Sequence, residues 1–170
     1  MTLELKQNIW NLDKSRLGFY CVNIIESSKQ HPSLAELLES DILKEKEFGD
    51  LEKFNETLEG NPNYYGAFLK NKIVESDFEN LDFSGLKSKF AEYWKAQDWG
   101  VDLLIFKKNF ELALLSLDEF ELSNRTFFYI SADEISPEKL TEPNFFSYLV
   151  CVIAIERYSN KVITLTFGSD

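Results

Sequence analysis

The stretch that decides the fold is Phe145-Phe146-Ser147-Tyr148-Leu149-Val150-Cys151-Val152-Ile153-Ala154-Ile155. Its apolar residues do not alternate with polar ones, so an extended strand there would be hydrophobic on both faces. The run is also much shorter than the roughly 20 residues of a membrane-spanning helix. We therefore expect a central strand of a sheet that is covered on both sides.

Further strand patterns surround this run in the second half of the chain. In residues 162–167 apolar residues alternate with Thr164 and Thr166, which predicts a strand with one solvent-exposed face. Ser136-Pro137-Glu138 predicts the start of a short helix with proline at its first position. The other expected strands are residues 101–106, 110–117 and 126–130, with a tight turn at Lys107-Lys108-Asn109 joining the first two.

Upstream of Asp98-Trp99-Gly100 the apolar residues recur at helical spacing. Ser33 and Glu36 form the S-x-x-E pattern of a helix capping box. Four other helices are expected. One follows a cap at Asp13 and has the apolar face Leu17, Tyr20, Cys21, Ile24 and Ile25, and one starts at Asp50 with Leu51, Phe54 and Leu58. The third starts near Tyr64 with Tyr64, Tyr65, Phe68 and Ile73, and the fourth starts at about Ser84 with Leu86, Phe90, Tyr93 and Trp94.

Helices first and strands afterwards predict an α+β fold. We expect N-terminal helices packed on a C-terminal, mainly antiparallel sheet of about four to five strands. The chain of 170 residues suits a single domain, 1–170, with a mainly helical half at 1–98 and a mainly strand half at 99–170.

Composition limits the classes of function. Aromatic residues make up 15% of the chain, which argues for a packed core and against disorder. The formal net charge of −11 disfavours binding to nucleic acid or to an anionic membrane and favours a basic protein partner. The N-terminus lacks the pattern of a signal peptide, so we expect a cytoplasmic protein. Cys21 and Cys151 lie in apolar runs and are expected to be buried thiols, although one disulfide stays open as an alternative.

Catalytic and metal-binding motifs do not stand out. His31 is the single histidine and precedes a proline, which is typical of a solvent-facing loop residue. The sequence therefore predicts no catalytic residue, no cofactor and no metal ligand. Two alternatives stay open: a carboxylate pair of glycosidase type, and an oxygen-rich calcium or magnesium site, for which Asp133-Glu134 and Asp118-Glu119 are neighbouring acids in a loop.

The densest charge lies between His31 and Gly60, where nine carboxylates stand against three lysines. Such a run is either a solvated helix face or an electrostatic docking surface that speeds the encounter with a cationic protein. An exposed aromatic residue beside it, from the pairs Phe127–Phe128 or Phe145–Phe146, would add a binding hot spot. The candidate partner-binding residues are Glu45, Glu47, Asp50, Glu52, Glu56 and Glu59, with a second group at Asp118, Glu119 and Glu121.

The layout of helices followed by a hairpin resembles that of small acidic bacterial immunity proteins of toxin systems. The residues that carry the resemblance are Trp99-Gly100-Val101-Asp102-Leu103-Leu104-Ile105-Phe106-Lys107-Lys108-Asn109-Phe110-Glu111-Leu112-Ala113-Leu114-Leu115. The resemblance implies tight, non-catalytic binding to a cognate toxin.

We therefore expect an inhibitor of immunity type, steered to a basic toxin domain by its carboxylates. Other functions stay open: a secretion or assembly chaperone that acts as a dimer, a mimic of DNA, or an enzyme that depends on carboxylates or a metal.

Overall fold

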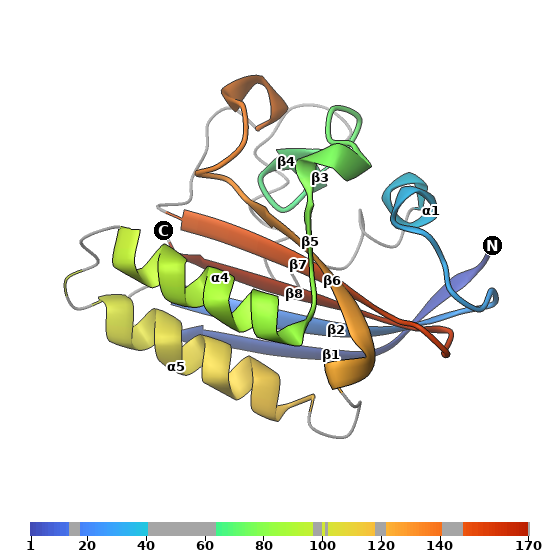
Figure 1. Cartoon of the computed structure of the whole chain (residues 1–170), viewed down its shortest axis with the longest axis horizontal. Helices are drawn as coiled ribbons and strands as arrows, with labels where there is room; N and C mark the ends of the chain where they lie inside the picture. Colours follow the sequence, from blue (N-terminus) through green and yellow to red (C-terminus); the bar gives the residue numbers. More distant parts are fainter. Residues whose placement is uncertain are drawn as a thin grey trace.

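The computed structural model describes residues 1–13, 18–40, 64–96, 100, 102–117, 122–140 and 148–169. It shows an α+β fold built on a six-stranded antiparallel sheet with the strand order β1-β2-β8-β7-β6-β5 (Figure 1). The strands are β1 (Leu3–Asp13), β2 (Gly18–Ser27), β5 (Glu79–Leu81), β6 (Arg125–Ser131), β7 (Tyr148–Glu156) and β8 (Lys161–Ser169).

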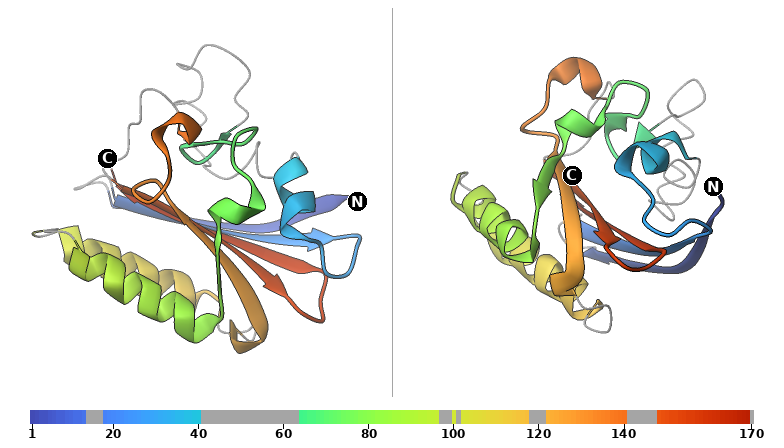
Figure 2. Two further views of the ribbon diagram at one scale, coloured as in Figure 1. Left: turned by 45° about the horizontal axis from the view of Figure 1, so that its top comes forward. Right: turned by 45° about the vertical axis from the view of Figure 1, so that its right-hand side comes forward.

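Each face of the sheet carries its own layer (Figure 2). Helices α4 (Phe83–Ala96) and α5 (Asp102–Leu115) lie side by side on one face. The short helix α1 (Leu34–Glu39) and the hairpin of β3 (Tyr64–Tyr65) and β4 (Phe68–Leu69) lie on the other. Three 3₁₀ turns complete the described elements: η2 (Glu75–Asp77), η4 (Leu122–Asn124) and η5 (Pro137–Lys139).

Strand β7 confirms the prediction made for the long apolar run. It pairs with β6 on one side and with β8 on the other, and Leu149 to Ala154 are fully buried. Val150 and Val152 pack in the core beneath α4 and α5, whereas Cys151 and Ile153 pack in the core beneath α1 and the β3–β4 hairpin. The two-sided burial explains why the strand has no polar face.

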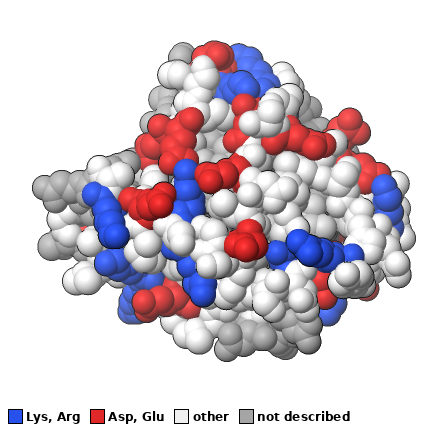
Figure 3. Space-filling view, viewed as in Figure 1, with Lys and Arg blue, Asp and Glu red and all other residues white. Residues whose placement is uncertain are grey.

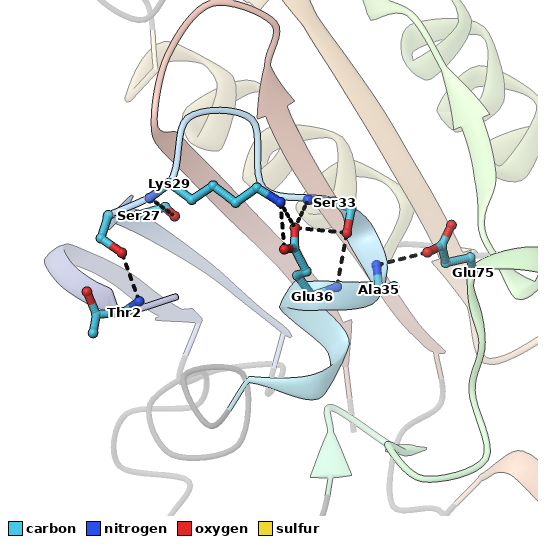
Figure 4. Close-up of polar contacts among 8 residues, drawn as sticks. Thr2, Ser27, Lys29, Ser33, Ala35, Glu36 and Glu75 are labelled. Atoms are coloured by element: carbon cyan, nitrogen blue, oxygen red, sulfur yellow. Dashed lines mark hydrogen bonds and ion pairs between the residues drawn. The ribbon is translucent and has the colours of Figure 1, made fainter.

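The capping box at the start of α1 is also confirmed (Figure 4). The backbone N–H of Glu36 donates to Ser33 Oγ at 3.2 Å, and the backbone N–H of Ser33 donates to Glu36 Oε2 at 2.8 Å. Lys29 Nζ adds an ion pair to Glu36 at 2.6 Å. The carboxylate of Glu75 accepts from the N–H of Ala35, which ties α1 to η2.

The expected order of helices before strands is wrong. The chain opens with the β1–β2 hairpin, and α4 and α5 lie between β5 and β6. Residues 18–25 form a strand because their apolar side chains serve both cores: Phe19 and Ile25 face one, Tyr20 and Val22 the other. Asp13 is the last residue of β1 and caps no helix. The division into a helical half and a strand half fails for the same reason.

Two further segments were assigned to the wrong element. The stretch from Tyr64 forms the β3–β4 hairpin, which Gly66 turns with a positive φ of 61°. Residues 102–115, expected as strands around a turn, form the single helix α5. Its buried side chains Phe106, Phe110 and Ala113 recur at helical spacing. The helices expected at Ser33 and Ser84 are present as α1 and α4; the one expected at Asp50 lies outside the described residues.

Strand β8 is buried on both faces, so the expected solvent-exposed face is wrong. Thr164 and Thr166 are buried, and Asn23 Nδ2 donates to Thr164 Oγ1 at 3.2 Å. Both cysteines are buried, as predicted, and they flank Thr166: Cys21 is its partner in β2 and Cys151 its partner in β7. Two strand spacings of about 4.8 Å separate them. Because a disulfide needs Cα atoms within about 7 Å, these thiols cannot be bridged without backbone movement.

Candidate functional site

The residues that the sequence predicted for partner binding all lie outside the described residues. They are Glu45, Glu47, Asp50, Glu52, Glu56, Glu59, Asp118, Glu119 and Glu121. Most of the net negative charge of the chain lies in the same undescribed segments. Those assignments therefore stay predictions, and the candidate site is built from the part of the chain that the structure describes.

A second group of carboxylates gathers above α4, over η2, β5 and the turn after β6, with lysines among them and along the helices (Figure 3). We call this group the acidic surface. The contacts of Lys139 with Asp77, and of Lys89 with Glu79 and Glu134, join the segments that form it. Its members are Glu75, Asp77, Glu79, Asp133, Glu134 and Glu138, and all but the half-buried Asp77 are exposed.

Lys89 on α4 organises the centre of the acidic surface. Its Nζ lies 2.9 Å from Glu79 Oε2, 3.0 Å from Glu134 Oε2 and 5.0 Å from the centre of the Tyr129 ring. Burial lowers the pKa of Lys89, but the hydrogen bonds and charges of the two glutamates outweigh it and hold that pKa above its ordinary value. The ammonium therefore stays charged and fixes β5, the turn after β6 and α4 to one another.

The turn after β6 is held to α4 by a second contact. Tyr93 Oη donates to Asp133 Oδ2, and the backbone N–H of Asp133 donates to Ser131 Oγ at 3.3 Å. Burial raises the pKa of Tyr93 far above its ordinary value, and the hydrogen bond to Asp133 adds to that shift. The phenol remains a donor, so Asp133 has a fixed orientation on the surface.

Little in the sequence alone predicts that these carboxylates lie together. The sequence singled out Asp133 and Glu134 only as neighbouring acids in a loop. Glu138 follows them closely, whereas Glu75, Asp77 and Glu79 lie 54 to 59 residues before Asp133 or Glu134, in a short acidic run of their own. The pairing of Glu79 with Tyr129 in the β5–β6 ladder brings the two segments together. A register between strands that are far apart in sequence has no local signal.

An apolar groove forms a separate feature beside α5. It has a volume of about 580 Å³ and is lined by Phe83, Glu111, Leu114, Leu115, Leu122 and Ser123. On the same helix Leu104 is 74% exposed and Leu115 is 64% exposed. Among the described residues, Glu111 is the single charged residue of the groove lining, so the groove has far less negative charge than the acidic surface to attract a basic partner.

The expected exposed aromatic residue is absent from one of the two predicted pairs. Phe127 is buried against α4, and Phe128 packs in the core on the opposite face. The pair Phe145–Phe146 lies outside the described residues. His31 is exposed, as predicted, and its ring meets that of Tyr158 edge-on at 6.3 Å.

Comparisons of the chain with models of protein families, with curated proteins and with solved structures found no match. The resemblance to immunity proteins therefore stays a prediction, and the hairpin that carried part of it is replaced by α5. Within the described ranges, no helix combines the length and the apolar character of a membrane span.

Proposed function

We propose that the protein is a non-catalytic binding protein of immunity type, which inhibits a bacterial toxin by engaging a basic domain of it. The acidic surface is the observation that carries the proposal. Carboxylates that gather on one side of a folded protein steer a cationic partner into the encounter and disfavour acidic ones. The overall charge of −11 also attracts a cationic partner, and it does so over longer distances than the individual carboxylates.

The ion pairs within the acidic surface favour a protein partner over a site that mimics DNA. Lys89 and Lys139 interrupt the carboxylates, so the described charges do not form a continuous line of acids. That pattern favours a protein with its own mixture of charges over a site built for the regular phosphates of DNA. A polar surface fixed by ion pairs also suits a preorganised interface, which loses little side-chain entropy on binding.

Co-expression with the protein encoded by the neighbouring gene tests the proposal. We expect that neighbour to arrest growth when expressed alone and to be harmless when both proteins are made. The purified pair should form a 1:1 complex whose association rate falls as salt is added. Unimpeded growth with the neighbour alone, or a stable homodimer that binds unfolded clients instead, would contradict the proposal.

A matched pair of triple variants tests the role of the acidic surface. Glu75→Gln, Glu79→Gln and Glu138→Gln together should slow association by about tenfold at low salt. Glu4→Gln, Glu92→Gln and Glu111→Gln together remove the same charge from exposed positions outside that surface and should have a much smaller effect. Equal rates for the two triple variants would show that only the overall charge matters.

A further inference from the structure

Helix α5 presents a line of four exposed residues to the solvent. They are Leu104, Lys108, Glu111 and Leu115, and the other residues of the helix are buried or half-buried. At about 3.6 residues per turn the four positions lie within about 60° of one another around the helix axis, over a length of about 16 Å. They therefore form a single straight row, which we call the α5 stripe.

Both ends of the α5 stripe are apolar. Leu104 is 74% exposed and Leu115 is 64% exposed, whereas the neighbouring helix α4 exposes polar residues such as Lys87, Ser88 and Glu92. A helix with apolar residues on its outer side as well as on its inner side is usually covered on both. The apolar groove lies at one end of the stripe, because Leu115 lines it.

The middle of the α5 stripe is charged but has no net charge. Lys108 and Glu111 take part in none of the ion pairs among the described residues. The whole of α5 has two carboxylates, Asp102 and Glu111, and two lysines, Lys107 and Lys108. In a chain with a net charge of −11, this neutral helix is a surface where a second copy can approach with little repulsion.

The order of the four residues is symmetric. Their spacings are four, three and four residues, so reversing the direction of the stripe exchanges Leu104 with Leu115 and Lys108 with Glu111. Two copies of α5 placed side by side in opposite directions would therefore put leucine against leucine and lysine against glutamate. A surface that is its own complement is what a two-fold contact between identical chains requires. A contact with an unrelated partner requires no such symmetry.

We propose that the α5 stripe joins two copies of this protein in an antiparallel, two-fold contact. Leu104 of each copy packs against Leu115 of the other and enters the apolar groove of about 580 Å³ beside it. Lys108 of each copy pairs with Glu111 of the other. The acidic surface lies across α4 from α5 (Figure 1), so it stays outside the contact and remains open to a basic partner.

The dimer should be weak, because one helix from each copy makes a small contact and small interfaces are typical of transient complexes. We expect a dissociation constant of about 10–100 µM. Protein at about 1 µM is then monomeric, and association rates or urea unfolding measured at that concentration describe the monomer. The sedimentation coefficient of the full-length protein should rise between about 1 µM and about 300 µM.

Charge reversal tests the two-fold register. Lys108→Glu places glutamate opposite Glu111 of the second copy, and Glu111→Lys places lysine opposite Lys108, so each variant alone should dimerise at least tenfold more weakly. An equimolar mixture of the two variants should dimerise again, because every lysine then meets a glutamate. Glu39→Lys on α1, on the opposite face of the sheet, makes the same change of charge as Glu111→Lys and should dimerise like the parent protein.

A second variant tests the apolar ends. Leu104→Ala should weaken dimerisation by about tenfold, whereas Val74→Ala, at a 52% exposed position outside α5, should not. Urea unfolding of dilute Leu104→Ala protein checks that its fold is unchanged. A parent protein that stays monomeric over the whole range, reversed variants that dimerise as well as the parent, or a mixture that stays monomeric would overturn the proposal. None of these results involves the basic partner, so the growth experiment decides the proposed function separately.

Discussion

Arg125 and Glu156 face each other across β6 and β7, and Arg125 Nη2 lies 3.0 Å from Glu156 Oε2. The arginine side chain is completely buried, whereas that of Glu156 is partly exposed. Burial lowers the pKa of Arg125, and the charge of Glu156 opposes that shift. The ion pair therefore keeps a buried guanidinium charged at the end of the sheet where η4 leads into β6.

Removing the charge of Glu156 should destabilise the fold. We expect Glu156→Gln to lower the free energy of unfolding by about 2 kcal/mol, because it weakens the compensation of a buried charge. Urea unfolding measures the effect. Arg157→Gln changes a neighbouring exposed charge and serves as the control; an equal loss in both variants would show that the Arg125–Glu156 pair contributes nothing specific.

Phe90 is the centre of the core under the helices. Its ring stacks on that of Phe110 at 4.1 Å and meets the rings of Tyr129 and Phe167 edge-on. We expect Phe90→Ala to cost about 3–5 kcal/mol in urea unfolding, because it leaves a cavity among rigid rings. Leu104→Ala on α5, at a 74% exposed position, should change stability by less than about 0.5 kcal/mol. A small effect at Phe90 would mean that the core rearranges to fill the space.

Sequence patterns predicted an element correctly where its distribution of apolar residues fits only one kind of secondary structure. Helix α4 has a buried face with Leu86 and Phe90 and a polar face with Lys87, so only the helical period fits. From Leu149 to Ile155 strand β7 has no charged or strongly polar residue on either face, and the apolar run is too short for a membrane helix. Strand β2 and helix α5 have apolar residues on more than one side, and the period of such segments fits a helix or a strand equally well.

The acidic surface was missed for a different reason. Its carboxylates come from η2, β5 and the turns that follow β6, and the helices α4 and α5 separate these segments in the chain. Only the pairing of Glu79 with Tyr129 makes them neighbours. The sequence shows which segments of the chain are rich in carboxylates, but which of these segments lie together on the surface depends on the fold.

Glu36 should make stability depend on pH in the acid range. The hydrogen bond from Lys29, with those from the backbone and hydroxyl of Ser33, lowers the pKa of Glu36 from 4.5 to about 2. A folded-state pKa below the unfolded value stabilises the fold above about pH 4.5, and this contribution is lost as the pH falls toward 2. Glu36→Gln keeps a capping side chain but removes the charge.

Thermal unfolding of Glu36→Gln between pH 7 and pH 2 tests this expectation. The variant should melt at a lower temperature than the parent protein near neutral pH, and the two should converge as the pH approaches 2. Glu39→Gln, on the same helix, changes an exposed carboxylate with no ion pair among the described residues and controls for net charge. A constant difference between Glu36→Gln and the parent at every pH would contradict the assigned role of the carboxylate.

The two cysteines should behave as protected thiols. Cys21 is 1% exposed and Cys151 0% exposed, and Thr166 separates them in the sheet. We expect the native protein to react slowly with Ellman's reagent, because the reagent reaches these sulfurs only when the sheet opens. After unfolding in urea without reductant, two thiols per chain should react, and one in Cys21→Ala. Absence of thiol in the unfolded protein would reveal a disulfide, and would require β2 and β7 to lie closer together than the strand order allows.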